Sequence, residues 1–309
     1  TYLEDDGTAK FEVPLYIGEK YHHAARTRSG LKCHYLLKNI RHSLGVNKLE
    51  SALLEMPVGT LHVDWIEVPD ISINHGSALP CLDANGYLIS ALSEALKYCK
   101  DHTAKELVIF GHTDTSGDHQ TNLDLSKLRA QAIKALMIKD VELWKSIVRQ
   151  NSKVSDYQAI LKVLTTNHGW SCDPGAVDNI DGPKTKAAAR SFQSAFNQKF
   201  NASLTVDGIV GPQTWGALCE TMHGLVLEAF KQKTNQTQLP QVAWGYSEGV
   251  YPLGECLPID QAGRNNYRSE KNRRVELYFY DSGMSSQGAQ APAAQRQLDW
   301  EHCPITGKE

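Results

Sequence analysis

The chain has no long hydrophobic run and no marked excess of charge of either sign. Of its 309 residues, 41% are hydrophobic and 22% are charged, and the formal net charge is only -3 at pH 7. No stretch reaches the roughly 18 consecutive apolar residues expected of a membrane-spanning helix. Nucleic-acid binders carry a basic patch or stripe, which this balance of charges does not indicate. The composition therefore favours a protein with packed cores whose partner is neither nucleic acid nor a lipid bilayer.

The cysteines offer no metal-binding or redox motif. There are seven, and no two have C-x-x-C spacing, which argues against a zinc knuckle or a thioredoxin-type site. One or two disulfides fit the count, and so do buried free thiols that pack like small hydrophobic side chains. Histidines 22, 23, 34 and 42 surround Cys33, but their spacing matches no template of a metal site. We therefore expect no metal and no cofactor.

Two separated stretches of the sequence read as alternating strands and helices. Period-two alternation or short apolar runs predict strands over 61–68, 106–111, 242–246 and 274–280. Apolar residues at helical spacing predict helices over 83–100 and 123–138, and a further helix is expected over 263–271. With 139–240 set aside, the order is β-α-β-α-β-α-β. This order predicts an α+β fold with helices on one face of a mixed sheet, built from residues 61–138 and 241–281.

Residues 139–240 have an organisation of their own. Helices are predicted over 141–150, 154–165, 184–200 and 214–229. The segment Val206-Asp-Gly-Ile-Val-Gly-Pro-Gln-Thr-Trp has an earlier half-copy, Ile180-Asp-Gly-Pro-Lys-Thr, in which Asp-Gly suits a turn and Pro a first helical turn. We predict an all-α three-helix module inserted in an exposed loop of the host domain. An N-terminal segment (1–60) and a linker with a tail (282–309) complete the chain.

Three ordered motifs of the host stretch resemble the OmpA C-terminal, peptidoglycan-binding family. They are Gly111-His-Thr-Asp-Thr-Ser-Gly after a strand, Asn122-x-x-Leu-Ser-x-x-Arg-Ala in the next helix, and Gly263-Arg with Asn272-Arg-Arg-Val-Glu-Leu near the end. The 206–218 segment resembles the helical peptidoglycan-binding (PG_binding_1-like) module often found beside cell-wall hydrolases. The resemblance implies a non-catalytic protein of the bacterial cell envelope, in the periplasm, whose partner is peptidoglycan.

Asp114 and Arg129 suit a ligand that carries an ammonium and a carboxylate on one carbon. Arginine presents a planar fork of donors to a carboxylate, and aspartate accepts from an ammonium. Such charge-assisted bonds are roughly twice as strong as neutral ones. In the resembled family the ligand is the diaminopimelate of the stem peptide, and these two residues match the positions that hold it. Taken as an isolated pair, the two residues would be better explained as an ordinary surface salt bridge worth about 0–1 kcal/mol, and the surrounding motif reverses that preference.

Four further residues are candidate ligand contacts, each with a structural alternative. Asn122 either positions the loop through bonds to backbone or caps the helix. Asn74 stands where the resembled family usually has Asp, in Ile73-Asn-His-Gly-Ser-Ala. Arg273 matches a family arginine near the site, or is a strand-end charge in solvent. Thr115 either bonds the ligand or satisfies its own loop.

The constellations of a hydrolase are missing from the sequence, which has no H-E-x-x-H and no G-x-S-x-G. We therefore expect a binding protein and not an enzyme. Two alternatives stay open. One is a component that tethers a secretion or injection apparatus to the wall and docks to an envelope protein complex through residues 1–60. The other is a cell-wall hydrolase whose catalytic part is residues 1–60 or lies outside this chain.

Overall fold

The computed structural model describes residues 2–3, 9–10, 64–68, 73, 75–80, 82–256, 258–261 and 264–281. Near the N-terminus it contains two short strands, β1 (Tyr2–Leu3) and β2 (Ala9–Lys10), which pair antiparallel. The predictions for residues 1–60, those for 282–309 and the one for Asn74 lie outside the described residues. Docking of a partner through residues 1–60 therefore stays a prediction.

A mixed sheet organises the host domain. Its strands are β3 (Asp64–Val68), β4 (Lys105–His112), β5 (Val250–Gly254) and β6 (Val275–Asp281). Their order is β3-β6-β4-β5, in which β6 runs antiparallel to both neighbours and β4 runs parallel to β5. Because side chains alternate along a strand, Leu107 and Ile109 of β4 share one face with Leu277 and Phe279 of β6, and all four are fully buried.

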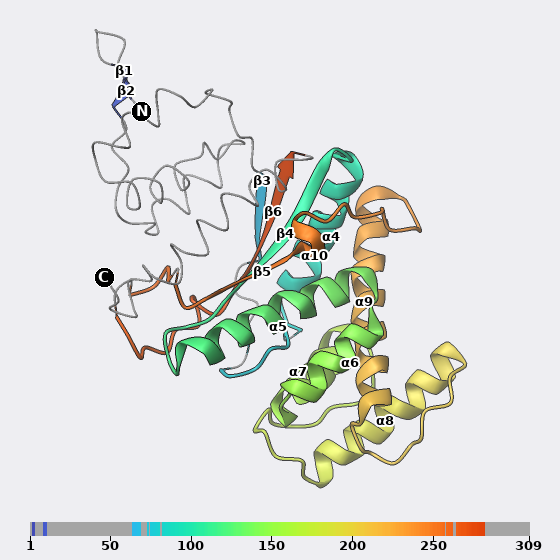
Figure 1. Cartoon of the computed structure of the whole chain (residues 1–309). Helices are drawn as coiled ribbons and strands as arrows, with labels where there is room; N and C mark the ends of the chain where they lie inside the picture. The colour runs from blue at the N-terminus through green and yellow to red at the C-terminus, as the bar shows by residue number, and fades with distance from the viewer. Residues whose placement is uncertain are drawn as a thin grey trace.

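Helices α4 (Tyr87–Asp101) and α5 (His119–Ile138) pack against the sheet, as the sequence predicts (Figure 1). The Asp83 carboxylate accepts the first free N–H groups of α4, from Tyr87 and Leu88 at 2.9 Å each. Asp118 caps α5 by accepting from Thr121 N at 2.9 Å. Both helices therefore begin where a carboxylate satisfies backbone donors that the helix itself leaves unpaired.

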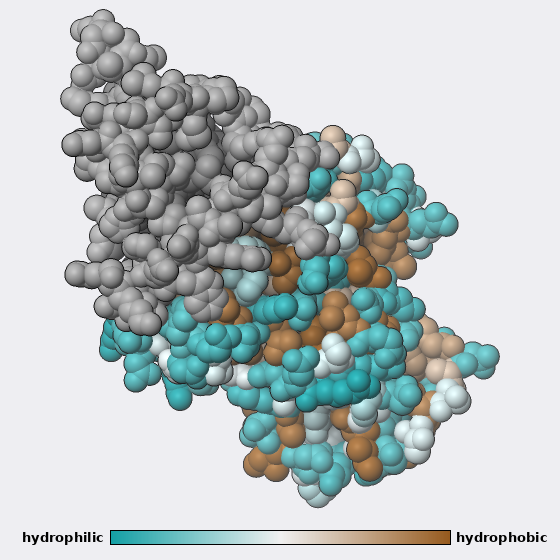
Figure 2. Space-filling model, in the orientation of Figure 1, coloured by the Kyte–Doolittle hydropathy of each residue, from teal (hydrophilic) through white to brown (hydrophobic). Residues whose placement is uncertain are grey.

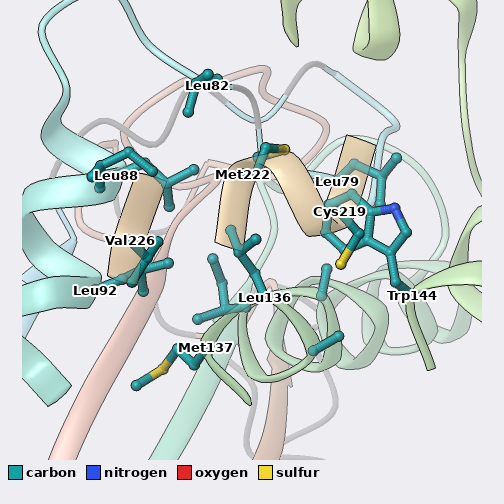
Figure 3. Packing of buried hydrophobic residues seen from close by; sticks show 14 of the residues in the cluster. Leu79, Leu82, Leu88, Leu92, Leu136, Met137, Trp144, Cys219, Met222 and Val226 are labelled. Carbon is teal, nitrogen blue, oxygen red and sulfur yellow. The ribbon is translucent and has the colours of Figure 1, made fainter. Parts of the chain in front are cut away.

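The inserted region contains the four helices that the sequence predicts over 139–240, and it shares a hydrophobic core with the host domain. It comprises α6 (Val141–Gln150), α7 (Val154–His168), α8 (Pro183–Phe200) and α9 (Pro212–Thr234). Figure 3 shows residues of the insertion and the host in one hydrophobic core: Leu88 and Leu92 of α4, Leu136 of α5, Trp144 of α6, and Met222 and Val226 of α9. The helical module thus extends the host core, because α6 and α9 both pack on host helices.

Two local predictions in the host domain are wrong. The strand expected over 242–246 is replaced by an isolated bridge at Trp244 and a short helix, α10 (Tyr246–Gly249), and strand β5 follows. Pro252 obscures β5 in the sequence, but proline is tolerated in an edge strand, and β5 is the edge of the sheet.

The helix expected over 263–271 is also absent, since the described residues 264–271 form turns, bends and irregular backbone. Asn272 explains why, because its amide oxygen accepts from the backbone N–H groups of Ile259 and Asp260 at 2.9 and 2.8 Å. Its amide nitrogen donates to the carbonyl of Asp260 at 2.9 Å. Side-chain bonds of this kind offer the backbone an alternative to helical bonding. The third host helix of the predicted order is therefore a loop tied by Asn272.

Three of the cysteines, Cys99, Cys172 and Cys219, are buried free thiols. Burial raises the pKa of the Cys99 and Cys219 thiols to about 12, which keeps them protonated. The interpretation as small hydrophobic side chains is thus confirmed for these three. Within the part of the chain that the structure describes, no helix has the length and hydropathy to cross a bilayer.

Candidate ligand-binding site

The candidate site lies where β4 ends and α5 crosses it. A side chain at Gly111 would place its Cβ 1.9 Å from the Ser126 carbonyl oxygen of α5, so only glycine lets the helix approach the strand this closely. The register of β4 against β5 shifts between Gly111 and His112. The close packing brings Arg129, one turn further along α5, to the end of the strand that leads into Asp114.

Asp114 is a buried carboxylate, with 3% of its surface exposed. Its Oδ2 accepts from Arg273 Nη1 at 2.8 Å and from Ser269 N at 3.4 Å. Its Oδ1 accepts from the hydroxyl of Ser116 and from Ser116 N, the latter at 3.3 Å. Burial alone would raise the pKa of Asp114, but the bonds from Ser116 and Arg273 outweigh it and leave this pKa below its usual value. Asp114 is therefore ionised at neutral pH.

Arg129 is even more buried, with 1% of its surface exposed. It donates from Nε to the Ser77 carbonyl at 3.0 Å and from Nη1 to the His112 carbonyl at 2.7 Å. Burial lowers the pKa of Arg129 to about 9, helped by the charge of Arg273 and opposed by that of Asp114. The side chain therefore stays cationic at neutral pH, and its charge is close enough to Asp114 for the two to interact. The direct ion-pair partner of Asp114, however, is Arg273.

Arg273 is an integral part of this cluster and not a charge in solvent. Besides its ion pair with Asp114, its Nε donates to the Ile73 carbonyl at 3.0 Å, and only 10% of its side chain is exposed. Arg129 holds the Ser77 carbonyl of the same loop. The two arginines thus fix the segment from Ile73 to Ser77 from both of its ends. The pair predicted from the sequence, Asp114 and Arg129, is therefore part of a triad. In it the Asp114 carboxylate interacts with the guanidinium groups of both Arg129 and Arg273.

Thr115 and Asn122 organise the loops around the triad. Thr115 is fully buried, and its hydroxyl donates to the Arg264 carbonyl at 2.8 Å and accepts from Tyr267 N at 2.9 Å. Asn122 Nδ2 donates to the Ser116 carbonyl at 3.1 Å. The capping alternative for Asn122 is wrong, because Asp118 caps α5. Thr115 and Asn122 thus make bonds to loop backbone in this structure, which is the structural role that the sequence left open for each.

Sequence reasoning missed several polar partners. Glu255 accepts from Asn122 Nδ2 at 2.6 Å, and it was overlooked because strand β5, which ends just before it, was not predicted. Ser269 sits in the loop that was expected to be helical. His75, whose Nε2 lies 3.1 Å from Ser116 Oγ, is exposed at the rim. Among the described residues, no group of histidine, cysteine and acidic side chains gathers as a metal site.

The helical module contains a second organised region, formed by two equivalent loops. In one, the amide nitrogen of Gln193 donates to Asp207 Oδ1, the Ile209 carbonyl and Thr214 Oγ1 at 3.1, 3.0 and 3.1 Å. Its amide oxygen accepts from Gly208 N at 2.9 Å. A single neutral side chain of α8 therefore holds the loop that leads into α9.

Gln158 of α7 makes the same bonds to the loop that leads into α8. Its amide nitrogen donates to Asp178 Oδ1, the Ile180 carbonyl and Thr185 Oγ1 at 2.9, 3.1 and 3.0 Å. Its amide oxygen accepts from Asn179 N at 2.9 Å. The internal repeat is thus present in the structure.

The register of this repeat differs from the predicted one. The counterpart of Asp207-Gly208 is Asp178-Asn179, and not the Asp-Gly dipeptide at 181–182. Gly208 and Asn179 occupy the same left-handed conformation, with φ of 80° and 64°. Asparagine is among the few residues that adopt this conformation readily, so it replaces glycine here and conceals the match. Pro183 and Pro212 begin α8 and α9, as predicted.

The two loops also expose apolar side chains at equivalent positions. The exposed fractions are 47% and 62% for Val177 and Ile180, and 47% and 64% for Val206 and Ile209. Figure 2 shows hydrophobic residues reaching the surface along the lower edge of the helical module, where these loops lie in Figure 1. The repeat therefore preserves exposed hydrophobic positions as well as the buried glutamine.

Two models of known protein families match the chain, one over part of the host domain and one over part of the helical module. Residues 83–157 match the model of the OmpA family, and residues 150–218 match the model of a putative peptidoglycan binding domain, PG_binding_1. Searches of curated proteins and of solved structures found no match. Both matched families are binding domains, and neither is catalytic. The chain thus contains an OmpA-family domain together with a putative peptidoglycan-binding domain, as the sequence motifs indicate.

Proposed function

We propose that this chain binds bacterial peptidoglycan without cutting it, and that the host domain holds the diaminopimelate of the stem peptide. Both matched families support peptidoglycan binding. The observation that carries the proposal is the buried carboxylate of Asp114 between Arg129 and Arg273 at the end of β4. A zwitterionic head group offers one charge to the acid and the other to the bases. The proposed role is to anchor the protein, or a complex that contains it, to the wall in the periplasm.

Arg129 has donor capacity left for a ligand carboxylate. Its Nε and Nη1 are used by backbone carbonyls, while Nη2 has no hydrogen-bond partner among the described residues. A guanidinium fixed by two carbonyls is already oriented, so little rotamer freedom is lost when the ligand binds. We assign Arg129 to the carboxylate and Asp114 to the ammonium.

The ammonium must replace part of the present shell of Asp114. An ionised carboxylate has about four acceptor positions, and Asp114 already accepts from Ser116 twice, from Ser269 and from Arg273. The bond from Ser269 N, at 3.4 Å, is the longest and therefore the easiest to give up. We propose that the 264–269 loop opens when the ligand enters. Thr115 and Asn122 hold the surrounding loops, and Asn74 is proposed as a further contact.

Calorimetry with free meso-diaminopimelate, together with retention on purified sacculi, tests the proposal. Asp114→Asn keeps the shape of the side chain but removes its charge, and we expect at least about tenfold weaker diaminopimelate binding, because charge-assisted bonds are about twice as strong as neutral ones. Asp118→Asn is the matched control, since it changes a neighbouring acid outside the triad and asparagine caps helices as well as aspartate does.

The sacculi should include both diaminopimelate-type and lysine-type walls, because lysine lacks the second carboxylate. We expect the wild type to prefer the diaminopimelate type and Asp114→Asn to lose this preference. If a folded Asp114→Asn variant binds meso-diaminopimelate as tightly as the Asp118→Asn control, the assignment of this site is wrong.

A further inference from the structure

One loop of the host domain lies between the candidate ligand-binding site and the helical module. The loop from His75 to Leu79 precedes α4, and Arg129 holds the carbonyl of Ser77 within it. On its other side, this loop meets the residues between α6 and α7 and the first turn of α7. The host loop is therefore held between the ligand-binding guanidinium and the module.

Asn151, which follows α6, binds this loop through both ends of its amide. Its Oδ1 accepts from Ala78 N at 2.7 Å, and its Nδ2 donates to the Gly76 carbonyl at 3.2 Å. Lys153 Nζ donates to the His75 carbonyl nearby. The amide of Asn151 thus completes the backbone bonding of the host loop as a neighbouring strand would.

Asp156 of α7 binds the same loop from a buried position. Its Oδ2 accepts from Ser77 Oγ at 2.8 Å and from Lys153 N at 2.8 Å, and the exposed fractions of Ser77 and Asp156 are 0% and 1%. A buried carboxylate that loses a donor is strongly disfavoured, so the hydroxyl of Ser77 must stay in place. The carbonyl of the same residue is the acceptor for Arg129 Nε.

We propose that Asn151 and Asp156 are positioning residues of the host site, which they serve by fixing Ser77 and thereby the guanidinium of Arg129. The inference rests on the proposed function of Arg129. It makes the helical module a structural part of the diaminopimelate site rather than a second binding domain on a tether. The matches to the two families overlap at residues 150–157, the segment that makes these bonds.

The test compares two asparagines of the module that both donate to host carbonyls. Asn151→Ala removes the bonds to the host loop, and Asn167→Ala removes a 2.7 Å bond to the Ala84 carbonyl at the start of α4, away from the triad. In calorimetry with meso-diaminopimelate, we expect Asn151→Ala to bind about tenfold more weakly, because an unsatisfied N–H at Ala78 lets the loop move. The Asn167→Ala variant should bind within about twofold of the wild type.

A second measurement does not depend on the ligand. The Nε–H of a buried, hydrogen-bonded arginine exchanges slowly with water, so the ¹⁵N signal of Arg129 Nε reports its bond to Ser77. We expect this signal to shift or broaden in Asn151→Ala and to stay unchanged in Asn167→Ala. If the wild type itself fails to bind meso-diaminopimelate, the proposed function is wrong, and the signal alone decides the positioning role. An unperturbed signal in a folded Asn151→Ala variant overturns that role.

Discussion

The host site and the helical module hold their loops by opposite means. In the host domain, charged side chains meet in the interior, with Asp114 between Arg129 and Arg273. In the module, one neutral amide per loop, Gln158 or Gln193, makes all the central bonds. The first arrangement brings charges out of water, which is costly unless each is paired and bonded. The second relies on a neutral amide at the centre of each loop, which also donates to an exposed acid of that loop, Asp178 or Asp207.

This difference indicates what each region is suited to recognise. A cluster of buried charges is sensitive to the charge and geometry of whatever enters it, which suits selection of a zwitterionic head group. The module's loops are rigidly held from within and present apolar tips, such as Ile180 and Ile209, to the outside. The acids of these loops, Asp178 and Asp207, already accept from the clamping glutamines and from backbone N–H groups. Specificity for diaminopimelate is therefore expected to reside in the host site.

Among substitutions that compare the charged host site with the neutral loops of the module, Arg129→Met is expected to lower the free energy of unfolding most. Methionine fills much of the same volume, but it leaves the Ser77 and His112 carbonyls without their donor in a buried position. Each such loss costs about 1–3 kcal/mol, so the free energy of unfolding should fall by roughly 3 kcal/mol in urea denaturation. Arg149→Met, at an exposed position of α6, is the control and should stay within about 0.5 kcal/mol of the wild type. A loss below about 1 kcal/mol for Arg129→Met would mean that its buried bonds stabilise the fold little.

A smaller effect is expected when the neutral clamp of the module is removed. Gln193→Ala leaves Gly208 N without its acceptor and removes one of the two donors to the Ile209 carbonyl, which should lower the free energy of unfolding by about 2 kcal/mol. Gln158→Ala should lower it by a similar amount, since its bonds are equivalent. Because the module and the host share one core, unfolding should remain a single transition in both variants. We expect wild type and Gln193→Ala to bind meso-diaminopimelate with equal affinity in calorimetry, because the loop that Gln193 holds is not part of the host site. A clear loss of affinity would contradict this assignment of specificity to the host site.

The sequence predicts those parts of the fold that depend on local pattern. Helical periodicity locates α4 to α9 to within a few residues, since each buries an apolar stripe. The motifs predict Asp114 just after a strand and Arg129 in the next helix, which is where β4 and α5 place them. What local pattern does not show is which residues close the site from a distance. Arg273 reaches both Asp114 and the Ile73 carbonyl, and no periodicity links positions so far apart in the chain.

Errors of prediction arise where side chains override backbone propensity. The segment before β6 looks helical in composition, yet Asn272 ties it into a loop with three bonds to backbone. Strand β5 is hidden by Pro252, which only an edge position tolerates. The bonds from Asn151 and Asp156 to the host loop could not be predicted from the sequence, because no local pattern shows how closely an inserted module packs on its host.

The smallest predicted effect concerns the register of the repeat. If Asn179 takes the place of Gly208, then Asn179→Gly relieves the left-handed strain while it loses the bond from Ser155 N to Asn179 Oδ1, 3.0 Å long. These changes oppose each other, and glycine also adds entropy to the unfolded chain, so the free energy of unfolding should change by no more than about 0.5 kcal/mol. The reverse change is not equivalent, because a Cβ at Gly208 would lie 2.6 Å from the Lys186 carbonyl oxygen. We expect Gly208→Asn to cost at least about 1 kcal/mol in the same urea titration, since backbone must shift to admit it. Similar values for the two variants would show that the repeats are interchangeable at this position and that close packing on α8 does not distinguish them.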